Sequence, residues 1–358
     1  MNDLPLTLRD LGERQIVREL LASRYGGGAA PFGDDCATLS DIPKGATVMA
    51  STDPCPPPMA HALGFEDEYY RGWLVATINL SDLAAAGAIP AGLLSSLILP
   101  AEMQVSSFER ILDGIDACCA QVGTASVGGN LKEGQDVDAA ATAVGYVEEG
   151  RPLSRSGARA GDLVVSLGEL GSFWAGSLMV RQGPGLEDGH LLLNNVLTPV
   201  PKVAVGAALR SAGLLRCAID NSDGLQPSLA QLAESSGVGI SLHLDSWEFS
   251  PGVRNAAEEL GTSPHRLALG WGDWQLIGSC AADRLSEIEL VAAREEVEVH
   301  VLGKVVQGTG VSARFDGNEG PLMRLESERF VTSSWFSAGL DGYIEQMLQS
   351  PLLESRAT

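Results

Sequence analysis

The residues with the clearest chemical potential in this chain are aspartates set among glycines and other small residues. Most of them follow an apolar, strand-like run or begin a helical pattern. Acids in this setting, without a Cys or His cluster, fit a hard cation such as Mg²⁺, which prefers oxygen ligands. Magnesium in turn implies a polyphosphate, and hence phosphoryl transfer or ATP-driven activation. The acids are Asp34, Asp35, Asp53, Asp82, Asp220, Asp223 and Asp273.

Each of these acids also has a plain structural interpretation. Asp82 interrupts an apolar helical run that begins at Trp73, where an acid is costly unless it is paired or holds a metal. A capping or hydrogen-bonded core aspartate would explain it equally well when the segment is taken alone. Asp34 and Asp35 are adjacent, and a turn or surface loop would explain that pair. The metal hypothesis therefore depends on the acids as a set.

Composition excludes several classes of protein. The chain has 358 residues, with 24 Lys and Arg against 46 Asp and Glu, which gives a net charge of −22. Such a field repels nucleic acid and anionic membranes. We find no leader-like N-terminus, no apolar run long enough to span a bilayer and no zinc-type cysteine spacing. These features predict a reduced, cytoplasmic protein that binds neither nucleic acid nor membrane.

Strand and helix patterns alternate along the chain, which indicates an α/β or α+β fold. A strand at 46–51 is expected to present Thr52 and Asp53 at its end, and a second strand to run into a turn at Gly128 and Gly129. A third, at 217–220, opens into a helix, where main-chain N–H groups favour phosphate. Turn and charged residues at 148–150 predict a boundary between domains 1–150 and 151–358.

Taken in order, these segments resemble thiamine-monophosphate kinase, a family within the aminoimidazole-ribonucleotide-synthase-like superfamily. Single motifs of this kind are weak, but the ordered set is specific and covers about 33–303. The segments are Gly33-Asp34-Asp35, Thr52-Asp53, Asn79-Leu80-Ser81-Asp82-Leu83-Ala84-Ala85, Gly128-Gly129, Arg155-Ser156-Gly157-Ala158-Arg159, Asp220 with Ser222-Asp223-Gly224-Leu225, and Asp273.

The resemblance implies a two-domain fold, with an N-terminal sheet that pairs across a homodimer and a C-terminal α/β sandwich. It implies ATP bound in a cleft between the domains, several Mg²⁺ ions, a small-molecule acceptor and direct in-line transfer. Catalytic roles would fall to Asp82, Asp220 and Asp223. The metal-binding acids it implies are Asp34, Asp35, Asp53, Asp82, Asp220 and Asp223. Nucleotide contacts would come from Gly33, Asp34, Thr52, Gly128, Gly129, Asn130, Lys132, Arg155 and Ser222.

Departures from the family pattern leave the acceptor open. Asn130 stands where the family has Asp, which removes a charge from one metal site, and Lys132 could hold a phosphate instead. Proline-rich 54–58 replaces the segment near the acceptor, and 270–275 loses two acids. Three functions therefore compete: a thiamine-phosphate kinase, a relative that uses ATP to phosphorylate or activate another acceptor, and a non-catalytic nucleotide-binding protein.

Overall fold

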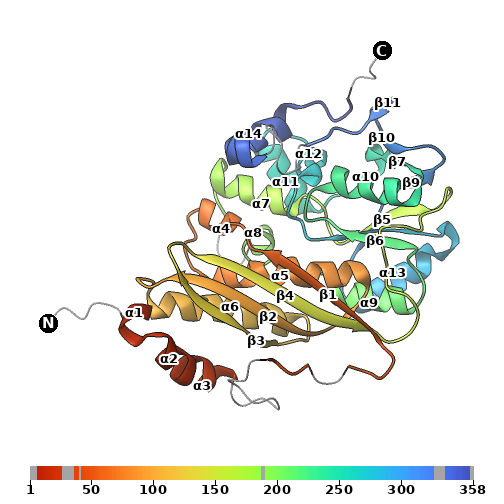
Figure 1. The fold of residues 1–358 in the computed structure, drawn as a ribbon. Helices are drawn as coiled ribbons and strands as arrows, with labels where there is room; N and C mark the ends of the chain where they lie inside the picture. Colours follow the sequence, from red (N-terminus) through yellow and green to blue (C-terminus); the bar gives the residue numbers. More distant parts are fainter. Residues whose placement is uncertain (1–5, 26–35, 40–41, 187–189, 326–334, 355–358) are drawn as a thin grey trace. The chain divides into compact units, whose positions relative to one another are not determined.

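A computed structural model describes residues 6–25, 36–39, 42–186, 190–325 and 335–354 of the chain. The chain forms two compact units, one from 1–83 with 88–150 and one from 84–87 with 151–358. Each unit contains one β-sheet. The expected mixed α/β fold is confirmed, and Figure 1 shows helices packed along the sheet of each unit.

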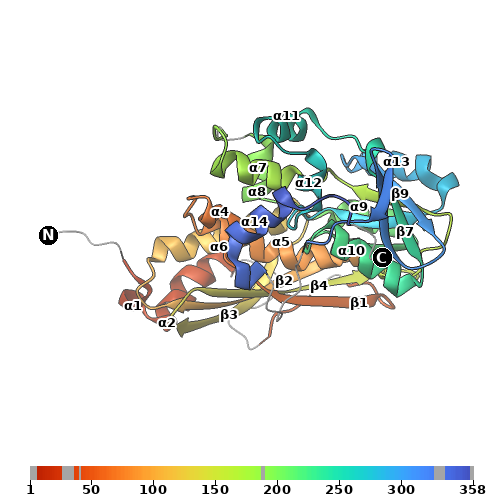
Figure 2. The same cartoon turned by 90° about the horizontal axis from the view of Figure 1, so that it is seen from above.

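The first unit is built on a four-stranded sheet with the order β1-β4-β2-β3, in which β2 and β3 run parallel and the other pairs antiparallel. Helices α5 and α6 lie along one face of it (Figures 1 and 2). Its elements are α1 (Leu8–Leu11), α2 (Glu13–Gln15), the π-helical η1 (Ile16–Leu21), α3 (Ala22–Tyr25), β1 (Thr47–Pro54), α4 (Met59–Ala62), α5 (Tyr69–Ala86), β2 (Ile89–Pro100), α6 (Val105–Gln121), β3 (Ser126–Gly134) and β4 (Asp138–Val147).

Alternate residues of these strands face the helices. Leu93, Leu97 and Ala141 are at most 3% exposed on the helix-covered face, whereas Val48 on the opposite face is 55% exposed. Two of the expected strand ends are wrong, because β1 continues through Asp53 to Pro54 and β3 continues through Gly128 and Gly129. Antiparallel pairing with β4 extends β1, since Asp53 is opposite Ala141 and Pro54 is opposite Ala140.

Helix α5 starts where an acidic side chain caps it. The Tyr69 main-chain N–H donates to Asp67 Oδ1 at 2.9 Å, which satisfies one of the unpaired donors of the first turn. Asp67, in the middle of the acidic run 66–68, therefore stabilises the start of this helix. The helix runs from Tyr69 to Ala86 and carries both Asn79 and Asp82.

The second unit is built on a seven-stranded sheet with the order β11-β10-β7-β9-β5-β8-β6. Its apolar cluster packs α9 and α13 against one face through Val165, Leu209 and Ile288, and α10 packs on β6, β7 and β10. Its elements are β5 (Leu163–Leu167), α7 (Ser172–Arg181), α8 (Leu191–Leu197), α9 (Val203–Ser211), β6 (Cys217–Asp220), α10 (Leu225–Ser236), β7 (Gly239–His243), η2 (Leu244–Ser246), α11 (Pro251–Glu259), α12 (Pro264–Leu269), β8 (Leu276–Cys280), η3 (Ala282–Arg284), α13 (Leu285–Arg294), β9 (Val299–Val306), β10 (Gly310–Phe315), β11 (Asn318–Pro321) and α14 (Trp335–Gln349).

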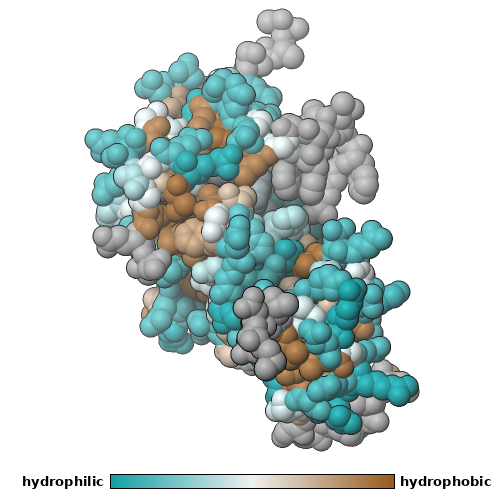
Figure 3. Space-filling model, turned by 90° about the vertical axis from the view of Figure 1, so that its left-hand side faces the viewer, coloured by the Kyte–Doolittle hydropathy of each residue, from teal (hydrophilic) through white to brown (hydrophobic). Residues whose placement is uncertain are grey.

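Hydrophilic side chains cover most of the molecular face in Figure 3, with apolar atoms gathered in patches between them. In the part of the chain that the structure describes, no helix is both long enough and apolar enough to cross a bilayer.

The contact between α5 and α6 depends on two glycines. A Cβ atom at Gly72 would overlap the carbonyl oxygen of Ile111, and one at Gly114 would overlap that of Tyr69. The two backbones therefore approach more closely than any side chain would permit. Since α5 carries Asn79 and Asp82, this crossing also fixes the helix that presents them.

We expect Gly72→Ala to lower the free energy of unfolding by about 2 kcal/mol or more, because the added methyl forces the helices apart. Gly252→Ala is the matched control, since the nearest atom to its added Cβ is Ser250 Oγ at 3.6 Å and the position is helical. That change should be neutral or slightly stabilising. Urea denaturation of both variants checks this, and equal stabilities would contradict the close-crossing argument.

Candidate functional site

In the first unit, β1 and α5 bring two of the predicted acids onto facing elements. Ser51 and Asp53 share one face of β1, and Asn79 and Asp82 lie about one turn apart on α5. The Ser51 hydroxyl donates a hydrogen bond to the Asp82 carboxylate. One turn earlier, the Asp53 main-chain N–H donates to Asn79 Oδ1 at 2.9 Å. The strand and the helix are therefore joined at both acids.

Asn79 holds this arrangement although the sequence did not single it out as a site residue. Its side chain is fully buried, and its amide donates to Val75 O at 2.9 Å and to Asp53 O at 3.3 Å. A buried amide is costly unless its donors and acceptor are paired, and here they are. The sequence feature that could have revealed this role is that Asn79 is a polar residue inside an apolar helical run.

The sheet separates the other predicted residues of this unit into two faces. Directly paired residues share a face, and one row of pairs joins Asp53, Ala141, Ser95 and Gly129. That row lies on the helix-covered face. The neighbouring rows put four predicted nucleotide contacts on the opposite face: Thr52, Gly128, Asn130 and Lys132. Asn130 and Lys132 are exposed there.

Gly128 and Gly129 have structural reasons to be glycine, and the expected turn at this pair is wrong. A Cβ at Gly129 would overlap the carbonyl oxygen of Ser95 on the paired strand β2. A Cβ at Gly128 would lie 3.1 Å from the Cβ of Ala37, so the segment after the acidic pair lies close to this part of β3. Gly33, Asp34 and Asp35 themselves lie outside the described residues.

The chemistry of the acids suits a hard cation, since Asp53 and Asp82 offer carboxylate oxygens. Within the described residues, no group of three or more His, Cys, Asp or Glu side chains is close enough to hold a metal ion. A complete site would therefore need donors besides the two that β1 and α5 bring together, such as phosphate oxygens, water or the acids outside the described residues.

In the second unit, two loops at one end of the sheet contact each other. The first starts after Asp220, the last residue of β6, and contains Ser222 and Asp223, and the second precedes β8. Gly272 N–H donates to Ser222 O at 3.1 Å, and Asn221 N–H donates to Gln275 O at 2.8 Å. Asp220 is 7% exposed, whereas Asp223 is exposed just before the first turn of α10. The structure thus places Asp220, Ser222 and Asp223 together at a helix N-terminus, as expected.

Asp273 caps a helix. Its carboxylate accepts from the main-chain N–H of Gly171 at 2.6 Å and of Phe173 at 3.0 Å, at the N-terminus of α7. Complete burial is the main cause that raises its pKa from the ordinary aspartate value to about 7, and these hydrogen bonds oppose the rise. Both carboxylate oxygens are engaged, so its role is structural.

A ring cluster that the sequence analysis missed adjoins this loop. Trp271 lies 5.3 Å from Phe173 and 5.2 Å from Trp174 between ring centroids, and Tyr343 of α14 stacks on Trp174 at 5.4 Å. Trp174 Nε1 also donates to Trp271 O at 2.7 Å. The altered motif at 270–275 therefore replaces acids with a segment whose Trp271 packs on buried rings. The sequence feature that could have revealed this cluster is Trp271, which stands where the family pattern has a small residue.

Arg155 lies apart from Asp223 within its own unit. Ser236, at the last residue of α10, donates to Arg155 O at 3.4 Å. Asp223 precedes the first turn of the same helix, which has 12 residues. At a rise of about 1.5 Å per residue the two ends are about 17 Å apart. The Arg155 side chain is exposed.

Comparison with known proteins gives the class. The chain matches the AIR synthase related protein N-terminal domain over residues 33–147 and the C-terminal domain over residues 159–316. It is an AIR-synthase-related protein, with the two-domain fold of that class.

The relatives narrow the class further. Thiamine-monophosphate kinase of Mycobacterium tuberculosis is 30% identical over 276 residues, which cover 76% of this chain and 82% of the relative. The crystal structure of the enzyme from Stenotrophomonas maltophilia has a TM-score of 0.70 and 29% identity, over 81% of this chain and 91% of that one. The AaThiL structure complexed with AMPPCP and TMP has a TM-score of 0.66 and 26% identity, over 89% and 97%. This chain belongs to the thiamine-monophosphate kinase family.

The buried cap predicts a pH dependence of stability. The pKa of Asp273 is raised to about 7, so the folded protein binds this proton more tightly than the unfolded chain does. Its contribution to stability is greatest below the ordinary aspartate pKa and is lost as the pH rises through about 7. The stability difference between the wild type and Asp273→Asn should therefore shrink between about pH 5.5 and about pH 8.

Denaturant unfolding at several pH values measures this difference. Asp283→Asn, at an exposed aspartate of η3, is the control and should track the wild type. Parallel curves for the wild type and Asp273→Asn would show that Asp273 is already ionised over the whole range.

Proposed function

We propose that this kinase transfers the γ-phosphoryl group of ATP to thiamine monophosphate, giving thiamine diphosphate and ADP, and that the reaction depends on Mg²⁺. The observation that carries the proposal is the fixed pair of acids on β1 and α5, Asp53 and Asp82, in a chain whose relatives are thiamine-monophosphate kinases. The relative complexed with AMPPCP, an ATP analogue, and TMP supports the choice of both substrates.

The transfer needs no covalent enzyme intermediate. A phosphate oxygen of the acceptor attacks the γ-phosphorus, and the bond from that phosphorus to the β–γ bridging oxygen breaks. ADP leaves with the electron pair, in line with the attacking oxygen. Positioning and neutralisation of charge supply most of the catalysis, which suits a site rich in carboxylates and poor in nucleophiles.

The proposed metal ligands are all carboxylates, so they offer only oxygen donors, which a hard cation prefers. Asp53 and Asp82, which hydrogen bonds hold in place, fit such a cation. Bound Mg²⁺ would neutralise charge on the phosphates. Ser51 keeps the Asp82 carboxylate in place, and Asn79 fixes the main chain of Asp53. The proposed metal ligands are Asp34, Asp35, Asp53, Asp82, Asp220 and Asp223, with Asp82, Asp220 and Asp223 as the catalytic acids.

The proposed phosphate contacts come from both units. Lys132, exposed on β3, would bind phosphate as a positive charge, and Asn130 would offer a neutral oxygen two residues away on the same face. Gly224 and Leu225 begin α10, so the N–H groups of its first turn favour an anion near Ser222. The remaining contacts of this kind are Gly33, Asp34, Thr52, Gly128, Gly129 and Arg155.

A second candidate is a kinase of the same family with a different acceptor. Trp271 favours it, because this half-buried ring stands in the loop in which the family pattern has acids. A partly exposed ring favours apolar or ring-bearing ligands over charged ones. The acceptor of this kinase could then differ while its nucleotide chemistry stays the same.

We also propose that two copies of the chain pair through the β1 side of the open sheet face, at the opposite edge from Asn130 and Lys132 on β3. Val48 is 55% exposed on the edge strand β1, and Ala50 follows it on the same exposed face. A sheet face that carries exposed apolar side chains is a favourable surface for association. This is the homodimer that the family resemblance implies.

Light scattering after size exclusion should give twice the chain mass of 37.5 kDa. Val48→Asp should shift the protein to the single-chain mass, because it places a charge in the apolar contact. Val306→Asp changes another exposed valine, on β9 of the second unit, and should leave the dimer intact. A wild-type monomer, or a Val48→Asp dimer as stable as the wild type, would contradict the pairing.

Phosphorus NMR of the protein with ATP, Mg²⁺ and thiamine monophosphate tests the activity. We expect signals of a diphosphate product and ADP. Asp82→Asn should lower the rate by about a hundredfold or more. Asparagine still accepts from Ser51, so the variant should fold, and its unfolding curve checks that. Asp283→Asn is again the control.

The other outcomes separate the candidates. If ATP stays intact but still binds by calorimetry, thiamine monophosphate is the wrong acceptor. If ADP appears with inorganic phosphate, ATP activates a different group. Full activity in Asp82→Asn would remove Asp82 from the site.

A further inference from the structure

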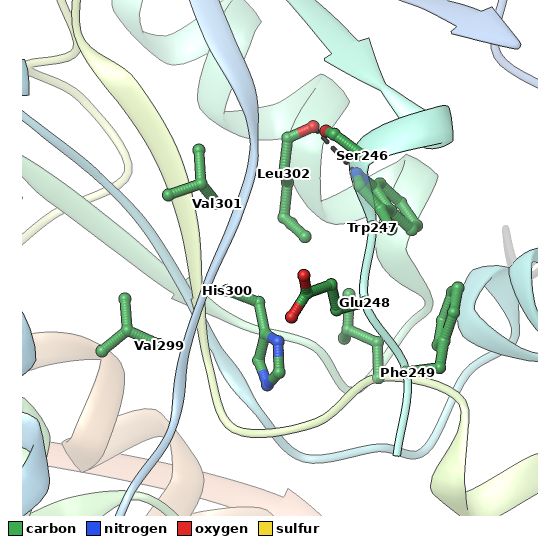
Figure 4. A pocket seen from close by; sticks show the side chains of 9 residues that line it. Ser246, Trp247, Glu248, Phe249, Val299, His300, Val301 and Leu302 are labelled. Carbon is green, nitrogen blue, oxygen red and sulfur yellow. Dashed lines mark hydrogen bonds between the residues drawn. The ribbon is translucent and has the colours of Figure 1, made fainter. Parts of the chain in front are cut away.

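A cavity of about 260 Å³ lies in the second unit, beside the first half of β9. Strand β7 pairs with β9 only through Gly239–Leu242, opposite Gly303–Val306. Beyond Leu242 the chain turns away into η2, and the segment 246–249 runs past the edge of β9 instead. The cavity fills the space between that segment and Val299–Leu302, as Figure 4 shows.

The aromatic wall of this cavity is held in place. Trp247 Nε1 donates to Leu302 O at 2.9 Å, which ties the segment to β9. Behind it, His265 lies 5.9 Å from Trp247 and 5.0 Å from Phe249 between ring centroids. Ser250 N–H donates to Glu169 Oε1 at 2.8 Å just after the wall. A wall fixed at several points costs little to order when a ligand binds.

Polar groups enter the cavity from both sides. The Glu248 carboxylate points between the two walls, and His300 faces it from β9 (Figure 4). Among the described residues, no hydrogen bond or ion pair engages Glu248. His300 Nε2 makes no hydrogen bond either and lies 3.5 Å from Glu298 Oε2. No Lys or Arg is among the described residues that line the cavity.

These features define the charge of a ligand. The cavity attracts a cation and repels an anion, because Glu248 lines it and Glu298 lies beside His300. The net charge of −22 on the whole chain acts in the same direction. The Trp247 ring supplies a face for a cation, and Leu302 supplies an apolar contact for a hydrocarbon part. An unprotonated imidazole nitrogen can accept a hydrogen bond from an ammonium N–H.

Size limits the ligand further. Pockets for drug-sized ligands have about 300 to 1,000 Å³, so this one suits a single ring with a short arm and is too small for a nucleotide. We propose that the cavity is a second binding site, for a small ring-bearing organic amine in its positively charged form, independent of the proposed ATP chemistry. The ammonium group contacts Glu248 and Trp247, and the ring lies against Leu302 of β9.

Calorimetric titration of the full chain with 2-phenylethylamine tests this. We expect a dissociation constant of about a millimolar or lower for a ligand of this size. 3-Phenylpropionate has the same ring and a negatively charged arm, and should not bind. Glu248→Gln should weaken amine binding about tenfold, because it removes the charge and keeps the shape.

Glu258→Gln, at an exposed glutamate of α11, is the matched control and should bind like the wild type. Trp247→Leu should also weaken binding, and unfolding curves establish that each variant is folded. The proposal is overturned if the amine does not bind, if the two probes bind equally well, or if Glu248→Gln leaves binding unchanged. A kinase assay on the same preparations separates this result from the proposed function, because loss of one does not entail loss of the other.

Discussion

The buried side chain of Asn79 is the contact on which the acids of the first unit depend. It bonds to both main-chain groups of Asp53 and to Val75 O in its own helix. Loss of this amide would leave buried donors and acceptors unpaired, at a cost of about 1–3 kcal/mol for each group. The same contact sets the position of β1 on α5, and therefore that of Asp53 beside Asp82. The Ser51 hydroxyl completes the arrangement at Asp82. Asn79 is thus a positioning residue for carboxylates that act on something else.

The second unit uses one acid for a different purpose. Asp273 neutralises the N-terminus of α7, and its burial means that its ionisation costs free energy in the folded state. Around it, Trp271 and its neighbouring rings fill the space near the loop. The loop at 220–224 keeps an exposed acid, Asp223, before a helix N-terminus. Within this unit the exposed acid Asp223 and the ring of Trp271 therefore lie in two loops that are hydrogen-bonded to each other.

The cavity beside β9 follows from strand lengths. Because β7 is shorter than β9, part of a strand edge remains without a neighbouring strand on that side, and the chain covers it with Trp247 and Phe249. An uncovered edge invites unwanted pairing, and an aromatic side chain bonded to a strand carbonyl blocks it. This covering segment leaves the cavity beside β9, whose described lining residues include the carboxylate of Glu248 and no Lys or Arg.

Much of the fold could be predicted from the sequence, because hydrophobic periodicity and turn residues act locally. The strand at 217–220 was expected at its observed bounds, and the α/β class follows from the alternation of elements. The motif order gave the family. Strand ends were less predictable: β1 and β3 extend past their apolar runs because pairing with neighbouring strands continues there, with Asp53 opposite Ala141 and Gly129 opposite Ser95.

The sequence by itself determined the family and which residues are candidates for chemistry: the acids, the altered Asn130 and the small residues around them. Tertiary structure decided how they are used. Sheet register put Asp53 on the helix-covered face and Asn130 on the open one, and burial turned Asp273 into a cap. The aromatic cluster joins residues from 173 to 343, and the cavity joins 170, 246–249 and 299–302. Contacts between segments so far apart depend on packing of the whole unit, which no local pattern specifies.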